Sequence, residues 1–170
     1  NSDGMKQITE ALAERTDIDA VHVVSHGIDR SVKLGNLWLN TDNIDQYESS
    51  LASWSGSLTA DADLLFYGCN LADGEDGRAI LATIAETTGA DIAASNDNTG
   101  AALLGGNWDL EYSLGAVETP TVFSNTLEAD WEGLLNTFTV TNTNASGAGS
   151  LRQAIIAANR LTGAGTIELR

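Results

Sequence analysis

The sequence is poor in several residue types, and each shortage excludes a class of protein. Its 170 residues include one cysteine, which excludes an internal disulfide and a multi-cysteine metal site. Eight lysines and arginines against 24 aspartates and glutamates give a formal net charge of −16. We therefore expect no nucleic acid as a partner, because such binding needs basic patches. No stretch approaches the ~20 apolar residues of a membrane span, so we also expect no membrane insertion in this segment.

What the chain does have is the length of one ordinary domain and an excess of acidic, small and polar residues. This composition is compatible with a secreted protein or a bacterial cell-surface protein, and we expect the chain to be part of a larger one. No cofactor is required by the sequence. Ca²⁺ is the one candidate, because carboxylates are abundant, although no EF-hand spacing is present.

Apolar runs of strand length alternate with helix-like patterns along the first hundred residues. The predicted strands are 20–25, 61–67 and 90–95, and the predicted helices are 5–15, 42–54 and 74–88. A hairpin is predicted at 32–39, a half-exposed strand at 107–112, and irregular structure at 117–126. Alternation of this kind is typical of βαβ units, so we predict an α/β fold with a mainly parallel sheet.

Two reactive side chains stand directly after predicted strands. His26 precedes Gly27 at the end of the first strand, and Cys69 follows Gly68 at the end of the second. If those strands are neighbours in a parallel sheet, both side chains emerge at the same edge, where ligands of α/β proteins bind. A thiol with an imidazole beside it is a minimal nucleophile and base. The backbone N–H groups of Gly27 and Cys69 could stabilise an oxyanion, and a helix after Cys69 would favour the thiolate.

Other interpretations of these residues stay open on the sequence pattern alone. A lone cysteine at a strand end is more often a small buried hydrophobe, and a lone histidine is more often structural. His22 alternates with valines inside the first strand, which favours a structural role. A serine hydrolase using Ser25 or Ser95 is disfavoured, because the spacing of a nucleophile elbow is missing.

The two motifs, VVSHG at 23–27 and LLFYGCN at 64–70, resemble the motif pair of the caspase-like (clan CD type) cysteine peptidases. More narrowly, about the first 130 residues resemble a caspase-like domain found near the start of very large bacterial adhesins and surface proteins. The resemblance implies a specific α/β fold, the caspase-like three-layer α/β/α sandwich with a mainly parallel central sheet.

The resemblance also implies roles for individual residues. Cys69 would be the nucleophile, His26 would protonate the leaving amine, and Gly27 with Cys69 would form the oxyanion hole. The segment after the third strand often helps to line the substrate pocket in such peptidases, which nominates Ser95, Asn96 and Asp97. Gly68 departs from the many relatives that carry Ala or Cys there, although a small residue is kept.

The last fifth of the chain has a different composition. Residues 138–159 resemble the opening coil of bacterial surface proteins with parallel β-helix repeats, in which one unit is not stable alone. We predict a peptidase-like domain at 1–130, a linker and processing site at 131–136, and the start of a β-helix-like repeat at 137–170. Within this chain the repeat region would form a short strand-turn-helix segment.

These observations predict a cysteine endopeptidase that cleaves its own chain, or a neighbouring surface protein, near residues 131–137. Its partner would be a polypeptide substrate. Because the self-processing relatives found in toxins cut after leucine, Leu134 and Leu135 are the candidates for the residue before the cut. The alternative is a caspase-like module without activity that serves an adhesin in interaction or retention.

Overall fold

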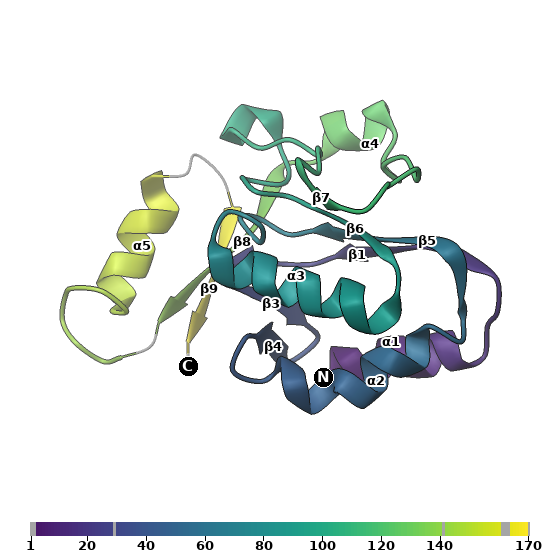
Figure 1. The fold of residues 1–170 in the computed structure, drawn as a ribbon. Helices are drawn as coiled ribbons and strands as arrows, with labels where there is room; N and C mark the ends of the chain where they lie inside the picture. The colour runs from purple at the N-terminus through teal and green to yellow at the C-terminus, as the bar shows by residue number, and fades with distance from the viewer. Residues whose placement is uncertain (1–2, 29, 141, 161–163, 170) are drawn as a thin grey trace.

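The computed structural model describes residues 3–28, 30–140, 142–160 and 164–169. Its central sheet has the strand order β1-β5-β6-β7 (Figure 1). The strands are β1 (Ile18–Val24), β5 (Leu58–Tyr67), β6 (Asp91–Ala94) and β7 (Tyr112–Leu114). β1, β5 and β6 are mutually parallel, and only the short β7 is antiparallel. The prediction of a mainly parallel sheet is confirmed, and so is the neighbourhood of the strands that precede His26 and Cys69.

Three helices cover one face of this sheet, α1 (Gly4–Ala13), α2 (Glu48–Trp54) and α3 (Glu75–Thr88) (Figure 1). The side chain of Asp3 caps α1 by accepting from the backbone N–H of Met5, and α3 ends at Gly89 in the left-handed conformation. The helices contribute Leu12, Leu51 and Ile80, one from each, to a buried core. The Leu64 and Phe66 side chains of β5 pack in the same core. A 3₁₀ turn, η1 (Ile44–Tyr47), precedes α2.

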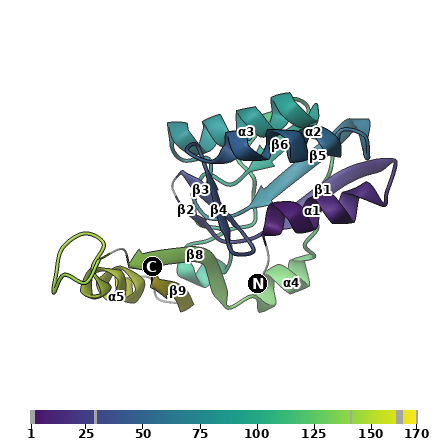
Figure 2. The same ribbon diagram turned by 90° about the horizontal axis from the view of Figure 1, so that it is seen from below.

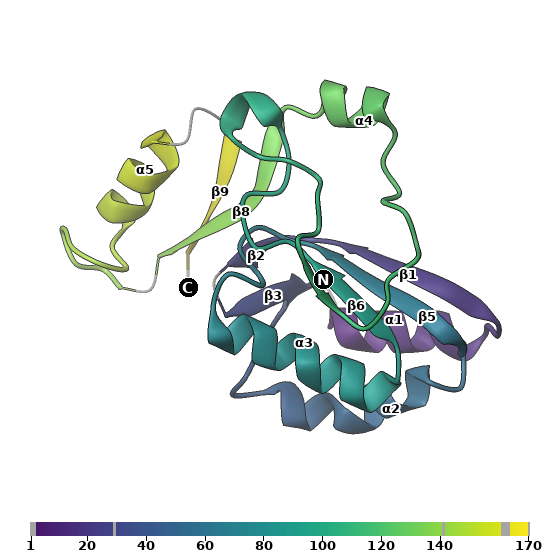
Figure 3. The same cartoon turned by 45° about the horizontal axis from the view of Figure 1, so that its top comes forward.

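The opposite face of the sheet is covered by residues 97–111 and 115–135, on either side of β7, which are mostly irregular and include η2 (Ala102–Leu104) and the short helix α4 (Asn125–Asp130). Figure 3 shows α4 on the side of the sheet away from α1–α3. The architecture is therefore mixed α/β with helices on both sides of a mainly parallel sheet, compatible with a three-layer α/β/α sandwich. No helix among the described residues combines the length and the apolar character that crossing a membrane requires.

Aromatic rings form the core of this second face. The Tyr67 ring stacks on His22 with 5.9 Å between ring centroids, and meets Phe123 edge-on at 5.0 Å. Trp108 contacts Phe123 at 4.2 Å and Trp131 edge-on at 5.5 Å. The ring contacts therefore join β1, at one edge of the sheet, to the residues just before β8.

A second sheet has the order β4-β3-β2-β8-β9 and joins distant parts of the chain. Its strands are β2 (Gly27–Ile28), β3 (Ser31–Leu34), β4 (Leu37–Asn40), β8 (Gly133–Val140) and β9 (Ala164–Leu169). β3 and β4 form the predicted hairpin. β2 lies between that hairpin and β8, and Gly27 is the parallel partner of Asn136.

Two regions differ from the sequence-based expectation. The alternating segment 107–112 was predicted as a strand, but only β7, which begins at Tyr112, forms one, because Asn107 is bonded into the loop at Asp97 and Asn98. Residues 131–136 were predicted as a linker, whereas β8 begins at Gly133 and the side chains of Leu134 and Leu135 are buried.

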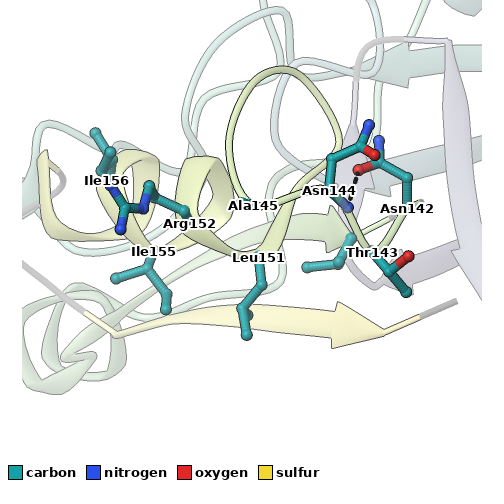
Figure 4. Close-up of a pocket in the computed structure, with 9 residues that line it drawn as sticks. Asn142, Thr143, Asn144, Ala145, Leu151, Arg152, Ile155 and Ile156 are labelled. Carbon is teal, nitrogen blue, oxygen red and sulfur yellow. Dashed lines mark hydrogen bonds between the residues drawn. The ribbon is translucent and has the colours of Figure 1, made fainter.

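The C-terminal segment consists of β8, α5 (Leu151–Arg160) and β9, with β8 and β9 parallel. Figure 2 shows these elements set to one side of the helical layer. The sequence predicts the start of a repeat at 137–170, and residues 141, 161–163 and 170 of that range lie outside the described residues. A hollow of about 570 Å³ opens between the end of β8 and α5. The apolar side chains of Leu151, Ile155 and Ile156 line it and stay partly exposed (Figure 4).

Candidate functional site

His26 follows β1, and its backbone is fixed by the neighbouring strands on both sides. The Ser25 N–H donates to Tyr67 O at 3.1 Å, which extends the β1–β5 ladder, and the Lys33 N–H donates to His26 O at 2.9 Å. The Ser25 hydroxyl donates to Lys33 O. The imidazole of His26 is half-buried, and its Nδ1 atom is buried without a hydrogen-bond partner among the described residues. This nitrogen is therefore unpaired but shielded from solvent.

Gly27 and Gly68 bring the two motifs into direct backbone contact. A Cβ atom on Gly27 would lie 2.6 Å from the carbonyl oxygen of Cys69 and 2.7 Å from the carbonyl carbon of Gly68. A Cβ atom on Gly68 would lie 3.2 Å from the Gly27 nitrogen. Gly27 thus has no room for a side chain, whereas Gly68 is tight but less constrained. The two glycines explain how the chain after β1 packs on the turn that carries Cys69.

The thiol of Cys69 is completely buried, with an exposed fraction of 0%. Its Sγ atom accepts from the Thr99 N–H at 3.2 Å and donates to Thr99 O at 3.5 Å. The turn itself is held by the loop after β6, since the Asn70 N–H donates to Asp97 O at 2.7 Å. Asn70 adopts a left-handed backbone conformation with φ of 57°, which asparagine tolerates better than most residues.

Burial raises the pKa of the Cys69 thiol to about 11. The backbone N–H groups of Thr99 and Leu135 oppose this rise, but they do not overcome it. The expectation that a helix directly after Cys69 favours the thiolate is not met. α3 begins only at Glu75, after a turn, so its N-terminus does not lie at the thiol. Cys69 is therefore a neutral thiol in this arrangement.

The three residues predicted to line a substrate pocket lie in one loop beside Cys69, in different surroundings. Ser95 is fully buried, and its hydroxyl donates to Asp97 O at 3.2 Å, so the side chain supports the loop. The Asn96 N–H donates to Glu111 Oε2 at 3.0 Å. Asp97 accepts from Asn107 Nδ2 at 3.0 Å, and burial together with the nearby Glu111 raises the pKa of its carboxyl. A pocket role for them stays a prediction.

The start of β8 covers Cys69. The Leu135 N–H donates to Thr99 O at 2.9 Å, the Ala101 N–H donates to Gly133 O at 2.8 Å, and Leu134 pairs antiparallel with Gly100. Leu134, Leu135 and Cys69 belong to one buried cluster on the second face of the sheet. The two candidate cleavage residues are thus brought to the predicted nucleophile, held between the loop after β6 and Gly27.

Two glycines shape the space that Leu134 occupies. A Cβ atom on Gly106 would lie 2.6 Å from Leu134 Cδ2. A Cβ atom on Gly100, which has φ of 132°, would collide with Gly133 O, so this glycine allows β8 to come close. Trp108 packs in the same cluster. Together these residues form a socket that is filled by one leucine side chain.

Comparison with protein families gives one result for this chain. The family described as "Domain of unknown function (DUF4347)" matches residues 1–135. The chain belongs to the DUF4347 family. Within the matched range lie both motifs, the loop after β6, and Leu134 and Leu135 at the start of β8. No curated protein and no solved structure matches the chain.

Some residues of this DUF4347 site could not be identified from the sequence pattern. Thr99 contacts the thiol through both its backbone N–H and its carbonyl, a role that any residue type except proline can fill. Gly100 and Gly106 form the socket for Leu134. The sequence signal for them is a concentration of glycines between residues 100 and 106, which does not by itself indicate a site. His22 has a structural partner, since its Nδ1 lies 3.1 Å from the Tyr67 hydroxyl.

Proposed function

We propose that this DUF4347 domain is a cysteine endopeptidase that cleaves its own chain between Leu134 and Leu135. The observation that carries the proposal is the path of β8 across Cys69, with backbone pairing on one side to Gly100 and on the other to Gly27. An extended backbone paired with its binding cleft is the usual way in which a peptide strand is held by another protein segment. Here the strand belongs to the same chain.

The chemistry requires four steps. The Cys69 thiol gives its proton to His26, and Sγ attacks the carbonyl carbon of Leu134. The N–H groups of Gly27 and Cys69 stabilise the oxyanion that forms. The C–N bond breaks as His26 returns the proton to the nitrogen of Leu135, which leaves as an amine. Water, with His26 as its base, then hydrolyses the thioester and releases the Leu134 carboxylate.

Several contacts support this assignment of roles. Gly27 packs directly on the backbone of Gly68 and Cys69, so the two motifs that would supply the oxyanion hole are in contact. A backbone hydrogen bond from the Leu135 N–H lowers the pKa of Cys69, so the nitrogen of the proposed scissile bond is near the thiol. The socket at Gly106 accepts the side chain of Leu134, which supports leucine as the residue before the cut. Ser25 and Ser95 use their hydroxyls in backbone contacts, which disfavours a serine nucleophile.

The described arrangement corresponds to the state before reaction. A thiol with a pKa of about 11 is protonated at neutral pH, so the cut requires His26 to take the proton of the thiol before Sγ attacks. In this proposal the domain belongs to a larger secreted or cell-surface protein, and the cut separates it from the β-helix-like segment that follows.

Mass spectrometry of the purified chain tests the proposal. The native chain is incubated with and without Ca²⁺, beside Cys69→Ala and His26→Ala. We expect products 1–134 and 135–170 from the native chain and none from the two variants. A Leu134→Asp variant should abolish the cut because the apolar socket excludes a carboxylate, whereas Leu103→Asp, at a leucine that is 96% exposed, should leave it unchanged.

Two results would contradict the proposal. The first is an intact native chain under every condition that keeps the chain folded, with and without Ca²⁺. The second is a cut at the same bond in Cys69→Ala, which would place the nucleophile elsewhere. Addition of native chain to intact Cys69→Ala chain distinguishes cleavage of a neighbouring molecule from cleavage within one chain.

One observation favours an alternative, a caspase-like module without activity that mediates interaction or retention. Complete burial of Cys69 and its raised pKa are what a core cysteine would show. In that case β8 is a structural strand and Leu134 a core residue. The alternative predicts that Cys69→Ala behaves like the native chain in every cleavage assay and that Cys69→Val folds normally.

A further inference from the structure

Three carboxylates lie together under the loop that follows β7. Asp63 is on β5, Asp91 is its register partner on β6, and Glu118 is in the loop. One oxygen from each of them lies within 4.8 Å of the others. Asp63 lies in the middle of β5 and Asp91 at the start of β6, whereas Cys69 follows the carboxyl end of β5. The cluster is therefore separate from the site of the proposed cleavage.

The Asp63 carboxylate is the unusual member of this cluster. Its residue is 1% exposed, and its Oδ1 atom is buried with no hydrogen-bond donor among the described residues. Its other oxygen accepts from the backbone N–H groups of Glu118 at 3.2 Å and Thr119 at 2.8 Å. A buried carboxylate oxygen without a donor is unfavourable, and two further carboxylates beside it add repulsion.

No salt bridge within the described part of the chain neutralises these three carboxylates, because the ion pairs there join Lys6 to Glu10 and Arg30 to Asp76. The Asp91 side chain accepts from the Ala116 N–H at 3.0 Å, which is a neutral donor. A bound cation would balance the charge of the cluster.

We propose that Asp63, Asp91 and Glu118 bind one calcium ion. Two oxygens that each lie about 2.4 Å from a common Ca²⁺ are at most about 4.8 Å apart, so the spacing of the three ligands suits a single ion between them. Hard oxygen ligands of this kind suit Ca²⁺ or Mg²⁺, and the exposed Glu118 leaves room for water. Ca²⁺ is favoured, because carboxylates on two strands and a loop do not offer the strict octahedron that Mg²⁺ requires.

The ion would fasten the loop to the sheet. From Glu118 and Thr119 the chain runs on to Val122, whose N–H donates to the Tyr67 hydroxyl at 3.4 Å, and then to α4 and β8. The bound cation therefore fixes the start of the segment that ends over Cys69. Its expected effect is a higher melting temperature, because a ligand that binds only the folded chain stabilises it.

Isothermal titration calorimetry of the full chain, treated with chelator and carrying Cys69→Ala to keep it intact, tests the proposal. Titration with CaCl₂ should show one saturable site per chain, and MgCl₂ should bind more weakly. Glu118→Gln should weaken Ca²⁺ binding at least about tenfold, as loss of even an outer partner of a metal site does. Glu118 is exposed, so this variant should fold, which circular dichroism verifies. Asp42→Asn, at an exposed aspartate elsewhere, should bind like the parent.

Four outcomes would overturn the calcium site. They are the absence of saturable CaCl₂ binding, an affinity unchanged in both Glu118→Gln and Asp91→Asn, an equal loss in Asp42→Asn, and Mg²⁺ binding as tight as Ca²⁺. None of these outcomes depends on cleavage at Leu134, so the calcium site and the peptidase proposal can fail separately.

Discussion

The reactivity of Cys69 toward an alkylating reagent follows from its surroundings. Burial raises the pKa of the thiol from 9.0 to about 11. At pH 8 a thiol with a pKa of 9.0 is ionised in about one molecule in ten, and a thiol with a pKa of about 11 in about one in a thousand. Since only the thiolate reacts, ionisation alone should slow alkylation of the folded chain about 100-fold relative to the unfolded chain.

The prediction is tested by removing a side chain of β8 that covers the Cys69 thiol. Leu135→Gly takes away a buried side chain of β8, and Leu103→Gly changes an exposed leucine as the control. We expect Leu135→Gly to raise the alkylation rate at least about tenfold by admitting water and lowering the pKa toward its ordinary value. Leu103→Gly should react like the native chain. The assay is the time course of iodoacetamide labelling, read as intact mass so that only uncleaved chain is counted.

The reasoning fails if folded native chain is labelled as fast as chain unfolded in denaturant. It also fails if Leu135→Gly and Leu103→Gly react equally slowly while circular dichroism shows both folded. The first result would mean that β8 does not cover the thiol in solution. The second would mean that other residues, and not β8, keep water from the thiol.

Three further predictions concern stability. The pKa of Cys69 is raised to about 11 in the folded chain from 9.0, so the neutral thiol stabilises the fold fully below pH 9, and this stabilisation is lost as pH rises toward 11. Chemical denaturation of the native chain should therefore show the free energy of unfolding falling by about 3 kcal/mol over this pH range. The same fall should be absent in Cys69→Ala. Gly27→Ala should cost stability at the upper end of about 1–3 kcal/mol by overpacking, and Gly68→Ala less than about 1 kcal/mol, as melting temperatures will show. Leu134→Ala should cost about 2–5 kcal/mol and Leu103→Ala no more than about 0.5 kcal/mol in urea unfolding.

The central sheet could be predicted from the sequence because its signals are local. Residues 61–67 contain an apolar run that ends at Gly68, and this places Cys69 after a buried strand. The β-branched stretch before His26 does the same for β1. Neighbouring parallel strands then bring both residues to one edge of the sheet, which the register of β1 and β5 confirms.

The cover over Cys69 could not be predicted in this way. Residues 133–136 carry no periodic pattern that distinguishes a linker from a strand, and their partners Gly27 and Gly100 lie far away in sequence. The same holds for the alternation at 107–112, where bonds from Asn107 to a loop outweigh the local tendency to form a strand. Burial of the thiol depends on these long-range contacts, so the raised pKa of Cys69 could not be predicted from the local sequence.

The edge-on contact of Trp108 and Trp131 gives the chain an optical signal at the entrance to β8. One indole is buried and the other is partly exposed, and their ring centroids are 5.5 Å apart. Coupling between two such rings contributes to the near-ultraviolet circular dichroism, and water reaching Trp131 shifts its emission to longer wavelength. Release of β8 from the sheet, by cleavage or by local opening, can therefore be followed in real time without an attached dye.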